Sequence, residues 1–466
     1  MLNTSVPSFA GAFYLAGDSG FEEACFARVF NARRPDRRPA AVLQAADVAD
    51  VVAGVRYASD RGWQVTVRAG GHSWSVWSVR DDALLIDLGA FTQLEFDPET
   101  NVVVAGPATR GGSDLDPFLA EQGRFFNGGH CPTVGIGGFL LQGGMGWNCR
   151  GWGWAAESIV AIDVVTAAGE VLRCDGENHS DLFWAARGAG PGFPAIITAF
   201  HLATRPRFSR LTQSMYLYPA ELAPQVFDWL YEARWDLPDS VELVAVSLDA
   251  STVPEIPFDG LALVVDGLCF ADDAEQAAKA LAPLATCPVI DQAILRNDAQ
   301  PVELATLLSS QLRANPEDHH YVVDCAYVQG ERADVVRAMA PAFTHLPTPK
   351  AFTLWFDLSR APQRGLPDMA LSLQTDLYFA AYLVAEDEEQ VERCLAWIEE
   401  RATELEPVKA GIYLGDSDLT RRPAQFMSDA AYTRLQQIRA DRDPAGMFCD
   451  YLRVDGIPVN TNPWQA

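Results

Sequence analysis

Short apolar runs alternate with amphipathic stretches along the first 200 residues of the chain. Between Ala46 and Arg61 apolar residues recur at helical spacing, and Trp63 to Val67 then alternates as a strand does. This pattern predicts a helix that leads directly into a strand. A second strand is expected at Ala83 to Leu88. Further strands are expected at 101–105, 161–166, 170–173 and 195–204.

From about Pro206 the pattern changes to longer strands that alternate with amphipathic helices. The strands are predicted at 241–248, 260–267, 321–327, 351–358 and 376–384, and the helices at 273–284 and 387–405. The tail, 429–451, predicts a helix that ends at Asp443-Pro444 and a strand that could rejoin the N-terminal part. We therefore expect an α+β protein in which a domain at 206–415 is inserted between the two parts of another domain, 1–205 and 416–466.

Composition and charge exclude several classes of protein. The 466 residues are 49% hydrophobic and 21% charged, as in a globular protein of two or three domains. The 35 Lys and Arg against 62 Asp and Glu give a formal net charge of −27, which repels nucleic acids and anionic lipid surfaces, so no nucleic-acid partner is expected. The sequence has no run of about 18 uncharged apolar residues and no basic segment before an apolar one at its N-terminus. We expect a cytoplasmic protein with no membrane association.

Several common catalytic and metal-binding motifs are absent. The nine cysteines form no CxxC pair, which argues against a disulfide framework and a zinc ribbon. His130 and Cys131 are adjacent, but no second spaced pair accompanies them, so no metal site is expected. There is no GxSxG motif and no P-loop. Leu140 stands where the third glycine would follow Gly135-Ile136-Gly137, which disfavours a nicotinamide-binding fold.

Two glycine-rich stretches are the strongest signals in the sequence. Arg68-Ala69-Gly70-Gly71-His72-Ser73 predicts a tight turn after a strand, in which successive N–H groups could bind a phosphate. The second stretch, Asn127 to Trp147, holds eight glycines interleaved with apolar residues. Flexible linkers are polar, so this composition indicates backbone that packs closely against a large flat partner.

Taken together, these stretches resemble the FAD-binding module of the berberine bridge enzyme-like branch of the vanillyl-alcohol oxidase and p-cresol methylhydroxylase superfamily. The resemblance continues through 163–171, 181–188 and 434–439, and through Asp443-Pro444 and Phe448. It implies a two-part FAD-binding domain of the vanillyl-alcohol oxidase type and an inserted substrate domain, in which helices cover an antiparallel sheet.

The resemblance also implies FAD that is covalently bound at two points. His72 would bind the 8α carbon through a ring nitrogen, and Cys131 would bind C6 through sulfur. Imidazole and thiolate are both nucleophiles that can add to an electrophilic flavin. Val134 matches the family position that controls oxygen access, where a small side chain is typical of an oxidase. The other residues expected to contact FAD are Arg68, Ala69, Gly70, Gly71, Ser73, Pro132, Val134, Gly135, Gly137, Gly138, Gly144 and Ile197.

Hydride transfer from a carbon that bears OH or NH needs a base for the heteroatom proton. Tyr378 and Tyr413 are the preferred candidates, because a tyrosinate whose pKa is lowered by its surroundings can serve as a base. Asp324 and Asp357 are further candidates.

Two other features leave alternatives open. Relatives carry Tyr-x-Asn-Tyr before Asp-x-Asp-Leu, and this chain keeps the aspartates, Asp416 and Asp418, but not the Asn-Tyr pair. Trp147, Trp152 and Trp154 could either wall a substrate pocket or pack between the domains.

The function that these observations favour is an FAD oxidase. It would oxidise an alcohol, sugar or amine group of a small molecule by hydride transfer to flavin N5, and O2 would be reduced to H2O2. A dehydrogenase or an oxidative ring-forming enzyme of secondary metabolism is the first alternative, and a catalytically silent flavin-binding protein is the second. The expected partners are a small substrate and O2, and the expected assembly is a monomer or a homodimer.

Overall fold

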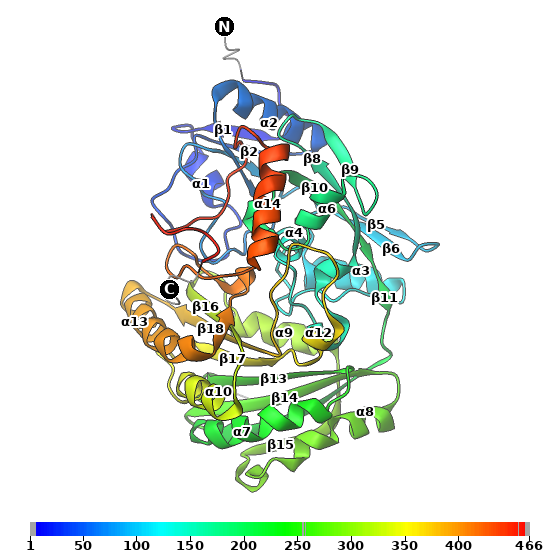
Figure 1. The fold of residues 1–466 in the computed structure, drawn as a ribbon, viewed down its shortest axis with the longest axis vertical. Coiled ribbons are helices and arrows are strands. Elements are labelled where there is room, and N and C mark those ends of the chain that lie inside the picture. Colours follow the sequence, from blue (N-terminus) through cyan, green and yellow to red (C-terminus); the bar gives the residue numbers. More distant parts are fainter. Residues whose placement is uncertain (1–5, 254–255, 257, 455, 462–466) are drawn as a thin grey trace.

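A computed structural model of the chain describes residues 6–253, 256, 258–454 and 456–461. Figure 1 shows that the first part of the chain and its last helix, α14 (Asp429–Arg442), lie together in the upper half. The lower half is formed by the middle of the chain. Within the described residues, no helix combines the length and the apolar composition that crossing a membrane requires.

A four-stranded sheet near the N-terminus has three parallel strands and one antiparallel edge strand. Its order is β1 (Ala12–Leu15), β2 (Ala41–Gln44), β4 (Leu84–Asp87) and β3 (Val65–Arg68). The helix α2 (Val48–Arg61) connects β2 to β3 and begins at Asp47, whose carboxylate accepts a hydrogen bond from the amide of Asp50. Small helix α1 (Phe21–Phe26) lies between β1 and β2 in the chain.

A second, five-stranded antiparallel sheet completes the upper half. Its order is β5 (Leu94–Asp97), β6 (Val102–Ala105), β10 (Ile196–Ala203), β8 (Ile159–Val165) and β9 (Val171–Cys174). Two short strands, β7 (Arg124–Phe125) and β11 (Arg205–Pro206), pair separately. The short helices α3 (Asp116–Glu121), α4 (Ile136–Leu141), α5 (Cys149–Trp152) and α6 (Ser180–Ala185) belong to the same part of the chain.

An eight-stranded antiparallel sheet spans the lower half. Its order is β15 (Leu295–Val302), β12 (Arg210–Pro219), β14 (Leu261–Ala271), β13 (Val241–Asp249), β17 (Phe352–Asp357), β18 (Leu377–Ala385), β16 (His320–Val328) and β19 (Lys409–Gly411). The side chains of successive residues along a strand point to opposite faces of the sheet, so each strand contributes side chains to both faces. One face of this sheet is covered by helices, and the other face is directed at the upper half.

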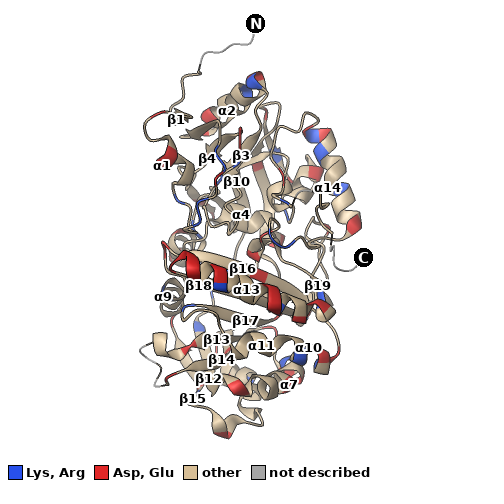
Figure 2. Cartoon of the chain, turned by 90° about the vertical axis from the view of Figure 1, so that its left-hand side faces the viewer, with Lys and Arg blue, Asp and Glu red and all other residues tan. Residues whose placement is uncertain are grey.

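Helices cover one face of the large sheet and build its core. They are α7 (Ala223–Ala233), α8 (Ala274–Leu281), α10 (Arg332–Met339), α11 (Pro341–Thr344) and α13 (Glu388–Leu405). Acidic residues recur along α13 (Figure 2), in keeping with the negative net charge of the chain. Two further helices, α9 (Leu304–Ala314) and α12 (Arg360–Arg364), precede β16 and follow β17. The α+β class with a helix-covered antiparallel sheet is confirmed.

The predicted strands and helices are present, with ends that shift by a few residues. The exception is the strand predicted after Asp443: the segment rejoins the N-terminal part as predicted, but in the described residues it does so through an isolated bridge between Val65 and Phe448 and not as a strand. The reason is local, because the Asp443 carboxylate accepts hydrogen bonds from the amides of Met447 and Phe448. Those amides are then not available to extend a ladder. The three-part division at 205 and 415 stays a prediction.

A buried ion pair ties α5 to the large sheet. The guanidinium of Arg150 contacts Asp357 at the end of β17, with 2.5 Å between Nε and Oδ2, and neither side chain is exposed. Arg150 also donates to the carbonyls of Pro238 and Leu237, at 2.7 and 2.9 Å. Because every charge here is desolvated, the removal of one partner leaves the other buried and uncompensated.

We predict that Arg150→Ala lowers the free energy of unfolding by about 3–5 kcal/mol. The matched control is Arg332→Ala, which breaks exposed ion pairs with Asp228 and Glu232 and should cost no more than about 1 kcal/mol. Urea unfolding followed by circular dichroism measures both. Equal losses in the two variants would contradict a structural role for the buried pair.

Candidate active site

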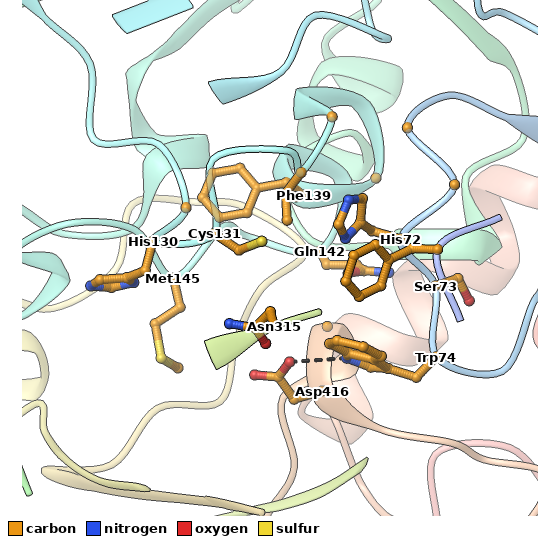
Figure 3. Close-up of a pocket in the computed structure, with 18 of the residues that line it drawn as sticks. His72, Ser73, Trp74, His130, Cys131, Phe139, Gln142, Met145, Asn315 and Asp416 are labelled. Carbon is orange, nitrogen blue, oxygen red and sulfur yellow. Dashed lines mark hydrogen bonds between the residues drawn. The ribbon is translucent and has the colours of Figure 1, made fainter. Parts of the chain in front are cut away.

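A cavity of about 1020 Å³ lies between the upper half and the large sheet. The turn 68–73, the stretch 129–142 and residues of β13, β17 and β18 line it. Figure 3 shows the side chains that converge there from both glycine-rich stretches and from the segment that holds Asp416. The cavity therefore brings together segments that are more than 300 residues apart.

The first glycine-rich turn presents free backbone donors to this cavity. Within the part of the chain that the structure describes, the N–H groups of Gly70, Gly71, His72 and Ser73 donate to no other group. Gly71 has a φ of +81°, which only glycine adopts without strain. Successive free N–H groups on a bend form a concave site for an anion.

Arg68, at the start of the turn, is held away from the cavity. Its guanidinium is buried, donates to Asp87 with 2.9 Å between Nε and Oδ2, and donates to the carbonyls of Ala24 and Cys25. Its backbone lines the cavity, but its charge is neutralised inside the fold. The side chain thus supports the turn and is not free to bind a ligand.

The two glycine-rich stretches touch backbone to backbone. A Cβ on Gly70 would lie 2.7 Å from Cα of Gly135, and a Cβ on Gly135 would lie 2.6 Å from Cα of Gly70. The second stretch is fixed from its other side, because Gly111 and Ile136 donate to the carbonyls of Val134 and Thr109. Only two glycines allow the stretches to approach this closely.

This contact brings His72 and Cys131 to one side of the cavity (Figure 3). The hydroxyl of Thr133 lies between them, 3.1 Å from Nε2 of His72 and 3.5 Å from Sγ of Cys131. Phe30 stacks on the His72 ring with centroids 4.3 Å apart. Burial lowers the pKa of His72 to about 4 and raises the pKa of the Cys131 thiol. The imidazole is therefore neutral, and nucleophilic, at physiological pH.

On the other side of the cavity, Asp416 gathers three donors. Tyr378 and Tyr382 each donate to Oδ2 at 2.8 Å. The indole of Trp74 donates to Oδ1 at 3.2 Å, the bond that is dashed in Figure 3. Burial raises the pKa of Asp416 although these donors oppose the shift. A carboxylate with a raised pKa that lines a cavity is suited to accept a proton. Sequence reasoning noticed Asp416 only as part of the retained Asp-x-Asp-Leu motif.

The expectation that their surroundings lower the pKa of Tyr378 and Tyr413 is corrected. Both phenols line the cavity, but burial and the neighbouring Asp416 charge raise their pKa values instead of lowering them. Tyr378 donates to Asp416, and Tyr413 accepts a hydrogen bond from the amide of Met145 at 3.3 Å. The protein's own groups therefore favour the protonated form of both phenols, and a role of either as the base stays a prediction.

Asp324 and Asp357 do not reach the cavity, which corrects their selection as bases. Asp324 pairs with Arg422 at 2.5 Å on the far side of the sheet, in a small separate pocket. The carboxylate of Asp357 already forms a buried ion pair with Arg150. Alternation along a strand shows that neighbours face opposite ways, but it does not show which face meets the cavity.

Most residues expected to contact FAD do line the cavity. They are Arg68, Ala69, Gly70, Gly71, Ser73, Val134, Gly135, Gly137, Gly138 and Ile197. Pro132 and Gly144 do not line it. Pro132 packs on Gly112, and Gly144 packs on Ala155 and Phe139.

The three tryptophans of 147–154 pack between elements and do not wall the cavity. Trp154 is fully buried and donates to the side chain of Gln374 at 3.1 Å. Trp152 packs on Phe125 and Phe270, with centroids 5.7 and 4.7 Å apart. The packing alternative is therefore the correct one.

Comparison with known proteins identifies the family. Residues 39–175 match the model of an FAD binding domain. The chain is 36% identical over 445 residues to the FAD-linked oxidoreductase nodO of Hypoxylon pulicicidum, covering 93% of this chain and 94% of that protein. Its fold matches that of Physcomitrella patens BBE-like 1 with a TM-score of 0.80, at 19% identity, over 96% and 98% of the two chains. This chain belongs to the FAD-linked oxidoreductases.

A further member of this fold group has a characterised flavin linkage. Glucooligosaccharide oxidase of Acremonium strictum matches the chain with a TM-score of 0.79, at 19% identity, over 96% and 97% of the two chains. Its structure is described as holding a 6-S-cysteinyl, 8α-N1-histidyl FAD. At this level of identity the match shows the shared fold.

The residues present suit FAD, the cofactor that the matched FAD binding domain implies. The free N–H groups of the first turn supply donors for an anionic diphosphate. Gly135, Gly137 and Gly138 leave their stretch of the wall without side chains, so that a flat ring can approach the backbone.

We predict that Gly70→Ala and Gly135→Ala each abolish most FAD binding. The added methyl group would overlap the facing backbone, so the two stretches must separate. The matched control is Gly176→Ala, because a Cβ there meets nothing within 4 Å. Visible flavin absorbance per mole of purified protein measures the effect. Normal flavin content in both variants would show that the contact does not build the site.

Proposed function

We propose that the protein is an FAD-dependent oxidase whose flavin is held covalently by His72 and Cys131, and which oxidises an alcohol, sugar or amine group of a small molecule with O2 as electron acceptor. The observation that carries this proposal is the meeting of His72 and Cys131 on one side of one cavity, joined through the Thr133 hydroxyl. The linkage described for the glucooligosaccharide oxidase uses the same two residue types.

When bound, FAD takes a hydride from the substrate and passes electrons to O2. The chain's own contribution begins with binding: the free N–H groups of 70–73 would hold the diphosphate, and Ile197 would pack against the cofactor. His72 would bind it through a ring nitrogen and Cys131 through sulfur. His72 is ready for this reaction because burial keeps the ring neutral.

The proton that leaves the substrate heteroatom goes to Asp416 in this proposal. Asp416 lines the cavity, and its Oδ2 already accepts from Tyr378 and Tyr382. A substrate OH or NH can transfer its proton to the carboxylate directly, or through either phenol, which donates its own proton as it accepts one. Neither route needs a tyrosinate at rest.

Val134 supports O2 as the acceptor. The side chain lines the cavity three residues after Cys131, and it is small. A bulkier residue would block access of O2 to the flavin more fully. Production of H2O2 in equal amount to substrate oxidised is the test, measured with a peroxidase-coupled dye for whichever alcohol, sugar or amine bleaches the flavin without air. Substrate oxidation that needs an added electron acceptor would instead identify a dehydrogenase.

We predict that His72→Ala and Cys131→Ala each leave one covalent bond to FAD. Intact-mass spectrometry after acid denaturation should show the mass of one FAD on both single variants, and bare polypeptide for the double variant. Thr133→Val is the control, because it removes the hydroxyl but neither nucleophile, so FAD should stay on the chain. A double variant that still carries FAD would refute the assigned linkage.

We predict that Asp416→Asn slows anaerobic flavin reduction by about 10²–10⁴-fold, the usual contribution of a positioned acid or base. Flavin content should not change, because Asp416 is not among the residues expected to hold FAD. In the wild-type enzyme the rate should rise with pH through a pKa above the ordinary aspartate range, because only the ionised carboxylate accepts a proton and burial raises its pKa.

Stopped-flow absorbance measures these rates, with Asp418→Asn as the matched control. Asp418 pairs with Arg33 at 2.6 Å and does not line the cavity. An Asp416→Asn variant that is reduced at the wild-type rate, with the wild-type pH profile, would remove Asp416 from the mechanism.

A further inference from the structure

The cavity extends beyond the flavin-binding loops onto the bare face of the large sheet. Residues of β12, β14, β13, β17 and β18 line it there. Because the strands are antiparallel and in register, the side chains on this face form rows across the sheet. One row runs from Asp266 to Val244, Phe356 and Tyr378, each paired with the next.

Apart from its two ends, this row is apolar, and so is the next one. In the second row Val264, Val246 and Leu354 lie side by side and line the cavity. Tyr378 marks one end of the first row, where it donates to Asp416. Asp266 marks the other end, where Gln213 is the one side-chain donor to it among the described residues.

Asp266 has fewer hydrogen bonds than a desolvated carboxylate needs. Its Oδ2 accepts from the side-chain amide of Gln213 at 2.8 Å. Its Oδ1 is buried and has no partner among the residues that the structure describes. Its paired neighbours on β12 and β13 are Met215 and Val244, which offer no side-chain donor. Burial, with a smaller contribution from Glu242, raises the pKa of Asp266 to about 7.

An acid at this position has no evident benefit for folding. A leucine would pack against Met215 and Val244 without the desolvation penalty, and an unsatisfied carboxylate oxygen costs stability. Asp266 lines the cavity, so a ligand is the available source of the missing donor once the carboxyl group turns toward it. The same face cannot satisfy many ligand hydroxyls, because Val244, Val246 and Leu354 accept no hydrogen bonds.

We propose that Asp266 binds a hydrogen-bond donor, a hydroxyl or a protonated amine, at the far end of an elongated and mainly apolar substrate. This inference rests on the proposed function, in which the reacting carbon lies near Asp416. Three strand spacings separate Asp266 from Tyr378, which places the two polar ends of the substrate about 14 Å apart. The apolar rows between them favour fused rings or a hydrocarbon skeleton over an oligosaccharide.

Binding of matched ligands to the holoenzyme tests the proposal without turnover when the flavin is reduced beforehand and O2 is excluded. The probes are phenylhexanol, phenylhexylamine, phenylhexyl methyl ether and phenylhexanoate, titrated by calorimetry into the wild-type protein, Asp266→Leu and Asp266→Asn. The alcohol and the amine should bind the wild-type protein about tenfold or more tightly than the ether, which lacks a donor. At a pH well above 7, where Asp266 is ionised, phenylhexanoate should bind most weakly, because its charge opposes that of Asp266.

Asp266→Leu should remove the preference for a donor and leave binding of the ether unchanged or tighter. Asp266→Asn keeps the shape and one acceptor, so it should weaken binding of the amine more than of the alcohol and improve binding of phenylhexanoate. The Asp266→Asn variant also tests the role of Asp266 if Asp266→Leu fails to fold. The matched control is Asp298→Asn, since Asp298 accepts from Tyr216 on the helix-covered side of the same sheet and does not line the cavity.

Equal affinity of the wild-type protein for the alcohol, amine and ether would overturn the proposal. So would a preference that survives in Asp266→Leu, or an Asp266→Asn variant with the wild-type order of affinities. These outcomes are distinct from failure of the proposed function. A donor preference without H2O2 production refutes only the oxidase, and H2O2 production without a donor preference refutes only the role of Asp266.

Discussion

The close approach of Gly70 and Gly135 is the contact on which the active site depends. Each residue occupies space that a Cβ of the other would need, so the two loops can meet only because both lack side chains. His72 follows the first loop glycines and Cys131 precedes the second, so this one backbone contact fixes the separation of the two nucleophiles. The Thr133 hydroxyl then bridges them. A double attachment to one flat ring requires this kind of fixed spacing, because covalent bonds tolerate little displacement.

The large sheet supplies the opposite wall, and its regular register decides what that wall can recognise. Antiparallel pairing aligns Asp266, Val244, Phe356 and Tyr378 in one row on the cavity face. Carboxyl groups therefore occur at the two ends of an apolar surface, Asp266 at one and Asp416, through Tyr378, at the other. The two acids differ in their surroundings. The protein supplies Asp416 with hydrogen-bond donors, which suits a base that must be held in place. Asp266 has one carboxylate oxygen without a donor among the described residues, and a substrate can supply that donor.

Buried charge has a separate, structural use elsewhere in the molecule. Arg150 and Arg68 are both enclosed, and each is neutralised by an aspartate and by backbone carbonyls. Arg150 connects α5 to the large sheet, and Arg68 holds the end of β3 just before the glycine turn. Their cost of desolvation is offset only by complete pairing. Buried aspartates thus have different uses that sequence composition does not separate: Asp87 and Asp357 neutralise a buried arginine, whereas Asp416 faces the cavity.

The sequence by itself determined the local features of this protein. Periodicity located the strands and helices within a few residues, because the apolar spacing of a half-buried element follows from its own geometry. The glycine-rich stretches, with His72 and Cys131 inside them, pointed to the cofactor, because close backbone approach requires glycine wherever it occurs. The tertiary structure decided which side chains share the cavity. Asp357 and Asp416 are both aspartates near strand ends, yet the fold gives one to Arg150 and the other to the cavity. Asp266 was missed for the same reason: its significance comes from a missing partner, and partners are set by contacts between residues far apart in the chain.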